Sequence, residues 1–241
     1  MRALPAHRFT VGLDLGQVND PSALAVIETD YVDRGTDAAT YEPLFEERHI
    51  LRFCERLPLQ TPYPAVVSRV VEVCEKLAPS PHFPDQRIPQ LVVDGTGVGR
   101  AVVDQFRLYK SGIPLRRISE TFEYPPPRPG LFELVAVSIT NSGKPREQDG
   151  YWHVSKKDLV AHLQLLLQRS RLRILEKLPE YPVLIRELLN FKLKISQAGN
   201  ASYSAWREHE HDDLVLAVAL AAWRAAPKKL PPVEGTRRLY W

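Results

Sequence analysis

The chain has 241 residues, of which 44% are hydrophobic and 25% are charged, a composition typical of a globular protein with a sizeable buried core. It contains no apolar run of the roughly 20 residues that a membrane helix needs, and its N-terminus lacks the apolar segment of a secretory signal. The net charge of +3 is too small to argue nucleic-acid binding by itself. Cys54 and Cys74 have neither metal-site nor disulfide spacing, so we expect two buried thiols in an intracellular protein.

The first half of the chain reads as strands followed by alternating strands and helices. Short connections between the first three strands favour an antiparallel meander, and the later alternation favours parallel strands with helices on the sheet faces. The pattern therefore predicts an α/β fold built on a mixed sheet. The expected strands are 9–15, 22–29, 44–53, 91–93 and 113–122, and the expected helices lie within 62–79 and 98–112.

The second half is predicted to be mainly helical. Ser155 is the expected N-cap of a helix, with Asp158 three residues on, and Pro227 ends a long apolar helix that begins near Asp212. We expect a linker at 124–130, a surface loop at 138–151, a helix at 179–190 and a β-hairpin at 191–206. The domain prediction is one domain at 1–226 and a basic, Pro-rich tail at 227–241.

Aspartates lie where an α/β site would place them. Asp14 and Asp94 are at the ends of predicted strands, and Asp212 and Asp213 open the last helix. Each has a structural alternative, because aspartate also caps turns and favours helix N-termini. Adjacent carboxylates beside a packed surface nevertheless repel unless a cation joins them, and clustered aspartates suit Mg²⁺ or Mn²⁺. Two such ions serve phosphodiester cleavage by activating a water and stabilising the leaving oxygen.

Other motifs exclude common enzyme classes. The turn after Asp94, GTGVG, matches neither the P-loop nor the dinucleotide fingerprint, so its glycines are expected to permit close backbone approach. There is no G-x-S-x-G elbow, and neither cysteine has a nearby histidine partner. His209 and His211 are expected to be solvated or capping residues.

Four segments in order resemble the nuclease domain of the large terminase subunit of tailed phages, from about Phe9 to Trp223. These are GLDLGQVNDPSALAVIE, LVVDGTGVGRAVVDQFR, VSKKDLVAHLQLLLQRSRLRI and EHDDLVLAVALAAW. The resemblance implies an RNase H-like fold of the RuvC/integrase superfamily and a metal-dependent DNA endonuclease. It implies that Asp14, Asp94 and the Asp212/Asp213 pair bind two divalent ions, Mg²⁺ or Mn²⁺, with Asp213 ranked above Asp212. Gly12 and Gly16 are expected to keep access open around Asp14.

The same resemblance implies double-stranded DNA as the substrate, in the cytoplasm of a phage-infected or prophage-bearing cell. The expected hairpin at 191–206 corresponds to one that approaches DNA in the family, and the expected phosphate contacts are Lys156, Lys157, Arg171, Arg173, Lys192 and Lys194. A separate terminase ATPase, small subunit or portal is the expected protein partner. Two departures stand out: no Walker A loop is present, and Leu214–Leu216 replaces a further acid of the family's last helix.

Three alternatives remain open at this point. A RuvC-like resolvase would prefer four-way junctions over linear duplex. An actin- or sugar-kinase-like ATPase shares the strand–Asp–x–Gly start and the DGTG turn, although such proteins need two domains and a longer chain. A non-catalytic DNA-binding or assembly module would not bind millimolar Mg²⁺ or Mn²⁺.

Overall fold

A computed structural model describes residues 7–16, 20–80, 86–113, 125–141, 143–197 and 212–226, with only the backbone described for Pro43 and 191–197. Strands and helices alternate irregularly along this part of the chain. The strands are β1 (Arg8–Asp14), β2 (Ala23–Thr36), β3 (Pro43–Arg56), β4 (Gln90–Asp94), β5 (Glu133–Thr140), β6 (Arg146–Gln148), β7 (Tyr151–Ser155) and β8 (Leu172–Ile174). The helices are α1 (Tyr63–Lys76), α2 (Gly99–Lys110), α3 (Lys156–Gln168), α4 (Tyr181–Gln197) and α5 (Asp213–Ala225).

The strands form one mixed sheet in the order β6-β7-β5-β4-β1-β2-β3-β8. β1, β2 and β3 pair antiparallel, as the predicted meander requires, while β4, β5 and β7 continue from β1 as parallel neighbours. This arrangement confirms the predicted mixed α/β sheet. It also makes β1 a central strand, flanked on one side by a parallel neighbour and on the other by an antiparallel one.

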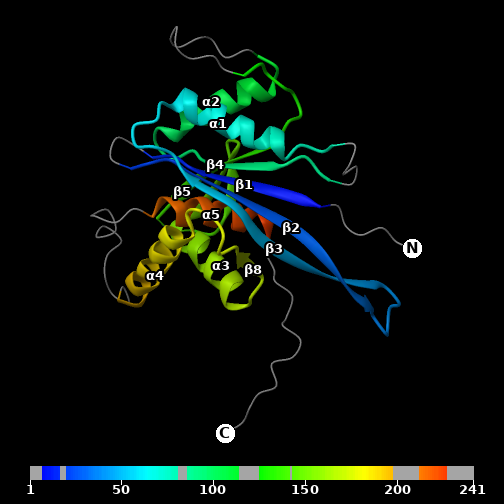
Figure 1. Ribbon diagram of the computed structural model, residues 1–241. Coiled ribbons are helices and arrows are strands. Elements are labelled where there is room, and N and C mark those ends of the chain that lie inside the picture. Colours follow the sequence, from blue (N-terminus) through cyan, green and yellow to red (C-terminus); the bar gives the residue numbers. More distant parts are fainter. Residues whose placement is uncertain are drawn as a thin grey trace.

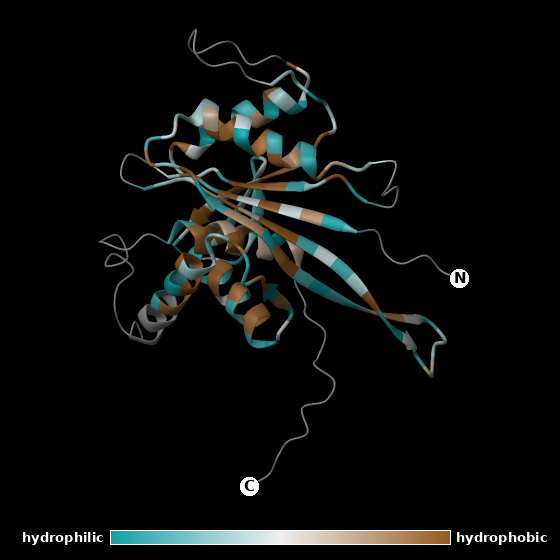
Figure 2. Cartoon of the chain, viewed as in Figure 1, coloured by the Kyte–Doolittle hydropathy of each residue, from teal (hydrophilic) through white to brown (hydrophobic). Residues whose placement is uncertain are grey.

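Helices cover the two faces of the sheet in separate layers, with α1 and α2 on one side and α3, α4 and α5 on the other (Figure 1). Alternate residues of the central strands enter two cores. Val11, Leu13, Leu24 and Val93 pack with α1 and α2, whereas Ala23, Ala25 and Val92 pack with α3 and α5. Apolar colouring is concentrated in the body of the sheet and in α5, and gives way to polar residues along the protruding β2–β3 ribbon (Figure 2).

Helix α5 lies almost directly on β1 because the strand offers a glycine there. A Cβ built on Gly12 would stand 2.1 Å from the Ala217 carbonyl oxygen and 2.8 Å from the Ala221 nitrogen, so no larger residue fits without moving the helix. Gly12 therefore serves close packing, and the expectation that it keeps the surroundings of Asp14 open is wrong. The small side chains of α5 bring its first turn next to the end of β1.

The region predicted as a loop at 138–151 contains strands instead. β5 extends to Thr140, and β6 and β7 form a hairpin closed by Asp149 and Gly150, whose φ angles are 53° and 74°. Positive φ at both central residues is the type I′ turn that Asp-Gly favours. The polar composition suggested a loop because the β6 side chains are exposed. Strand β4 pairs in parallel with β1 and with β5, while the strand expected at 113–122 lies almost wholly outside the described residues.

The predicted hairpin at 191–206 is wrong over its first strand, because α4 continues unbroken from Tyr181 to Gln197. Leu184, Leu188, Phe191 and Ile195 recur at helical spacing, which the local alternation of FKLKI obscured. Lys192 and Lys194 are about 200° apart around such a helix and do not share a face. Residues 198–211, with His209 and His211, and the tail 227–241 lie outside the described residues.

The remaining helices follow the predictions. α3 begins after Ser155, whose side chain accepts a hydrogen bond from the Asp158 backbone N–H at 3.0 Å, and α5 spans the expected apolar segment. Cys54 and Cys74 are free and buried, as expected. Within the described part of the chain, no helix combines the length and apolar character needed to cross a membrane.

Candidate metal centre

Asp14 and Asp94 occupy one cross-strand row of the sheet, together with Ala23 and Arg56. Asp14 pairs with Ala23, Ala23 pairs with Arg56, and the Leu13–Val93 pairing makes Asp94 the next parallel neighbour of Asp14. Neighbouring residues in register point to the same face, and Ala23 belongs to the core under α5. The row therefore places the two carboxylates and one guanidinium on the face that α5 covers, with adjacent strands about 4.8 Å apart.

The Asp14 carboxyl is in an unfavourable electrostatic position. Only 6% of the residue is exposed. Burial raises the pKa of Asp14 well above its ordinary value, the Asp94, Asp213 and Asp212 carboxylates raise it further, and Lys156 opposes them. Sequence-distant acids thus converge on this side chain. The carboxylate at the end of a core strand is held there against both burial and repulsion, which a purely structural aspartate does not require.

Asp94 is fixed by the turn that follows it. Its Oδ1 accepts hydrogen bonds from the Thr96 backbone N–H at 2.8 Å and from the Thr96 hydroxyl at 2.6 Å, a local arrangement that aspartate favours after a strand. Burial raises the Asp94 pKa, while the Thr96 hydrogen bonds and Lys156 lower it. A Cβ on Gly99 would stand 2.2 Å from the Asp94 carbonyl oxygen, so this glycine serves the expected close backbone approach.

Asp212 and Asp213 have different surroundings at the start of α5. The Asp212 side chain does not cap its own helix; its Oδ2 accepts a hydrogen bond from Lys156 Nζ at 2.7 Å. Asp213 is the first helical residue, is 5% exposed, and has its Oδ2 3.7 Å from Arg56 Nη2. The two adjacent aspartates are therefore paired with different basic side chains, Asp212 with Lys156 and Asp213 with Arg56.

Sequence reasoning missed a fifth carboxylate, that of Glu187 on α4. Its Oε1 accepts a hydrogen bond from Arg56, and its Oε2 accepts one from the Val215 backbone N–H in the first turn of α5 at 3.3 Å. Burial raises the Glu187 pKa to about 7, opposed by Arg56 and the Val215 hydrogen bond, while Asp213 adds to the rise. No local sequence signal marks Arg56 or Glu187, because they are 131 residues apart and meet only in the fold.

Carboxylates outnumber cations at this end of α5. Five acids, Asp14, Asp94, Asp212, Asp213 and Glu187, lie with two described basic partners, Lys156 and Arg56. Their oxygens are the hard ligands that Mg²⁺ and Mn²⁺ prefer, so the donor set fits such ions. Across the described side chains no three acid, histidine or cysteine residues stand in a ready-made ligand group. Lys156, Arg56 and Thr96 contact several of the acids.

The predicted DNA contacts do not gather in one place. Lys156 bonds to Asp212 in the centre itself, and Lys157 is exposed beside it on α3. Arg171 and Arg173 flank Leu172 on β8, which pairs with β3 around Ile50, six residues from Arg56 and therefore about 20 Å along the strand. The side chains of Lys192 and Lys194 lie outside the described ones.

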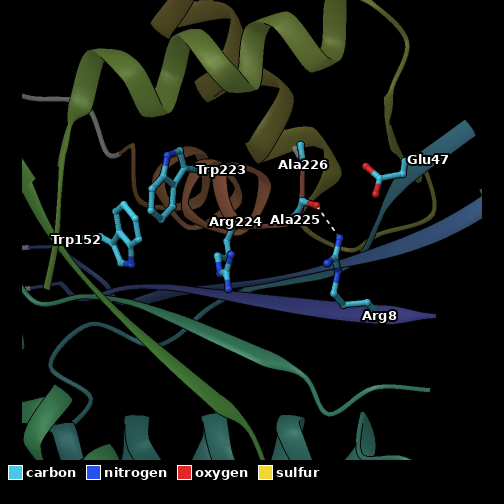
Figure 3. Close-up of a pocket in the computed structure, with 7 residues that line it drawn as sticks. All are labelled: Arg8, Glu47, Trp152, Trp223, Arg224, Ala225 and Ala226. Atoms are coloured by element: carbon cyan, nitrogen blue, oxygen red, sulfur yellow. Dashed lines mark hydrogen bonds between the residues drawn. The ribbon is translucent and has the colours of Figure 1, made fainter. Parts of the chain in front are cut away.

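A cavity of about 260 Å³ lies at the opposite end of α5, lined by Arg8, Glu47, Trp152, Trp223, Arg224, Ala225 and Ala226 (Figure 3). Arg8 Nη2 donates a hydrogen bond to the Ala225 carbonyl oxygen at 3.0 Å, and Arg224 forms an ion pair with Glu133. The two tryptophan rings meet edge to face. These arginines close the C-terminal end of the helix, where its dipole favours positive charge.

No protein-family model matches the chain, and no curated protein matches its sequence. Solved structures of the human cytomegalovirus terminase nuclease domain are similar to it. The Mn-soaked, inhibitor-bound form has a TM-score of 0.50 and 11% identity, over 94% of this chain and 87% of that one. The Mn-soaked form gives 0.46 and 12% over 94% and 87%, and a third structure gives 0.43 and 12% over 92% and 86%.

The chain has a terminase-nuclease-like fold. This result rests on the first comparison, together with the mixed eight-stranded sheet and its helical layers, and it confirms the RNase H-like architecture expected from the four segments. At 11% identity the likeness concerns the fold alone. The chemistry of the site depends on the residues of this chain.

Proposed function

We propose that the protein is a divalent-metal-dependent endodeoxyribonuclease, a phosphodiester hydrolase that acts on double-stranded DNA. The observation that supports this most directly is the convergence of Asp94, Asp213 and Asp212 on the buried Asp14 carboxyl, whose pKa they raise. A buried carboxyl whose pKa is raised by neighbouring acids, in a group where acids exceed cations in number, suits a cation site better than a structural role.

In this proposal Asp14, Asp94 and Asp213 hold Mg²⁺ or Mn²⁺, with Asp212 as a further ligand. When bound, a pair of such ions supplies Lewis-acid chemistry for the hydrolysis of a phosphodiester. The similar nuclease structure was soaked with Mn, which supports the use of a divalent ion by this fold.

The chain's own residues hold the acids in place. Asp14 is fixed by a central strand of a rigid sheet, Asp94 by two hydrogen bonds to Thr96, and Asp213 by the first turn of a helix packed on β1. A site on such elements keeps its ligands within the tolerance that in-line displacement demands. In this proposal Lys156 and Lys157, at the start of α3, neutralise phosphate charge beside the acids.

Concatemeric viral DNA as the natural substrate, and a separate terminase ATPase, small subunit or portal as partner, belong to the same proposal. They rest on the resemblance of the four sequence segments together with the terminase-nuclease-like fold. A RuvC-like resolvase is separated from this proposal by substrate, because it would cleave four-way junctions faster than linear duplex.

The test is plasmid cleavage with Mg²⁺, Mn²⁺ or chelator, using wild type, Asp14→Asn and Asp104→Asn. Asp104 is an exposed aspartate on α2 paired with Arg107, so it provides a matched control away from the centre. We expect metal-dependent cutting by wild type and Asp104→Asn, and a loss of at least about a hundredfold in Asp14→Asn. Cleavage by Asp14→Asn at the wild-type rate would refute the proposal.

A further inference from the structure

Arg56 stands between two carboxylates that come from different helices. Its Nη2 donates a hydrogen bond to Glu187 Oε1 and lies 3.7 Å from Asp213 Oδ2. The side chains of Glu187 and Asp213 are each 7% exposed, and that of Arg56 is 23% exposed. One guanidinium is thus the shared counter-ion of two buried acids, and it holds Glu187 more closely than Asp213.

Glu187 is anchored independently of Arg56. Its second oxygen accepts the Val215 backbone N–H, so the carboxylate is fixed at the N-terminal turn of α5, where a helix favours negative charge. Asp213 Oδ2 lies farther from the guanidinium, at 3.7 Å, and the Asp213 carboxylate also acts on Asp14, whose pKa it raises. The guanidinium therefore has a hydrogen-bonded and anchored partner in Glu187 and a more distant one in Asp213.

A divalent ion and a guanidinium repel each other, so both cannot lie against Asp213 at full strength. We propose that Arg56 is an internal counter-ion of Asp213 that competes with the divalent ion, and that Glu187 retains Arg56 when the ion binds. Glu187 is then a positioning residue that acts through Arg56 and is not itself a ligand. This inference rests on the proposed metal-dependent function.

The inference makes the two partners of one ion pair act in opposite directions on metal affinity. Arg56→Gln removes the competing charge, so Mn²⁺ should bind about tenfold more tightly. Glu187→Gln keeps an oxygen that can accept the Val215 N–H, but it removes the charge that holds Arg56. Arg56 then pairs with Asp213 alone, so Mn²⁺ should bind about tenfold more weakly. Calorimetric titration of the whole protein with Mn²⁺ measures both, and Arg56→Met serves as a second neutral variant if the glutamine variant does not fold.

The double variant separates positioning from ligation. If Glu187 acts only through Arg56, Glu187→Gln should have little effect on Mn²⁺ affinity in the Arg56→Gln background. A tenfold weakening that persists in that background would make Glu187 a ligand and overturn the inference. Equal shifts of both single variants in the same direction would also overturn it, because an ion pair that only supports the fold has that effect.

Arg52→Gln is the matched control, because Arg52 lies on β3 like Arg56, four residues and about 13 Å away, and also pairs with a glutamate, Glu28 of β2. We expect it to leave Mn²⁺ affinity at the wild-type value. Failure of the wild type to bind millimolar Mn²⁺ would instead refute the proposed function, so the two failures are distinguishable. Cleavage rates are not needed for either decision.

Discussion

The two ends of helix α5 lie over two cross-strand rows of the same sheet that carry opposite charge. Asp14 marks the row under the first turn, while Arg8 marks a second row, in which Arg8 pairs with Thr29 and Thr29 with His49. Six residues of β1, about 20 Å, separate the rows. Both follow the helix dipole, with acids at the N-terminal end and arginines at the C-terminal end.

The rows differ in how their charges are matched. At the C-terminal end Arg8 donates a hydrogen bond to the Ala225 carbonyl oxygen, and Arg224 pairs with Glu133. The arginines there therefore cap the end of a helix. At the N-terminal end five carboxylates lie with two described cations, and the Asp14 pKa is raised. A helix dipole alone explains the first arrangement. The excess of acid in the second is the feature that indicates a cation site.

The largest effect should come from the residue that holds α5 against both rows. Gly12→Ala places a Cβ 2.1 Å from the Ala217 carbonyl oxygen, which the helix can avoid only by lifting from β1. We expect a loss of about 3 kcal/mol or more in unfolding free energy, measured by thermal or urea unfolding. Gly143→Ala, where nothing lies within 4 Å, is a control for glycine replacement, although its φ of +111° adds some strain. Equal small losses in both variants would contradict the packing argument.

The second row, which contains Arg8, Thr29 and His49, should make the stability of the fold sensitive to acid. Burial, together with the nearby Arg8, Arg171 and His162, lowers the pKa of His49 from 6.5 to about 4. Below pH 6.5 the His49 imidazole binds a proton in the unfolded chain but not in the folded one. The free energy of unfolding therefore decreases as the pH falls from 6.5 to 4. We expect roughly 2–3 kcal/mol over this range. Thermal unfolding should show a shallower slope in His49→Gln; an unchanged slope would exclude His49 as its origin.

The row that contains Asp14, called the acidic row below, was predicted only in part from the sequence. Its residues differ in whether a local sequence signal marks them. Asp14 and Asp94 follow apolar strands, and Asp212 and Asp213 open an apolar helix, so each carries a local signal that predicted their convergence. Arg56 is 131 residues from Glu187 and has no such signal. It completes the row only because β2 and β3 pair in a particular register, which spacing along the chain does not specify.

The fold itself was predictable where periodicity was long and unambiguous. The apolar run of α5 and the capped start of α3 left little choice, whereas FKLKI alternates over too few residues to distinguish a strand from the end of α4. The Asp149–Gly150 turn was the overlooked signal for the β6–β7 hairpin. The strand β6 is polar and exposed, so it lacks the buried alternate residues by which a strand is usually recognised.

Removal of a charge from the acidic row should raise the free energy of unfolding, whereas removal of a structural aspartate would lower it. Asp14→Asn eliminates a carboxylate that burial and its neighbours oppose, so we expect unfolding free energy in chelator to rise by about 1–2 kcal/mol. Because the folded pKa is raised, wild-type stability falls as the pH rises above 3.8, and the variant should lack this component. A lower melting temperature in Asp14→Asn at neutral pH would instead indicate a structural aspartate.

The smallest effects should separate the two aspartates that open α5. Asp212 and its partner Lys156 are both more exposed than Asp213, so Asp212→Asn should change stability by less than about 1 kcal/mol. Asp213 is buried beside Arg56 and is expected to be the stronger ligand, so Asp213→Asn should weaken Mn²⁺ binding several-fold more than Asp212→Asn. Calorimetric titration of both variants decides the order. The reverse order would place the metal nearer to Asp212, Lys156 and α3. Asp213 and Arg56 would then serve only to support the fold.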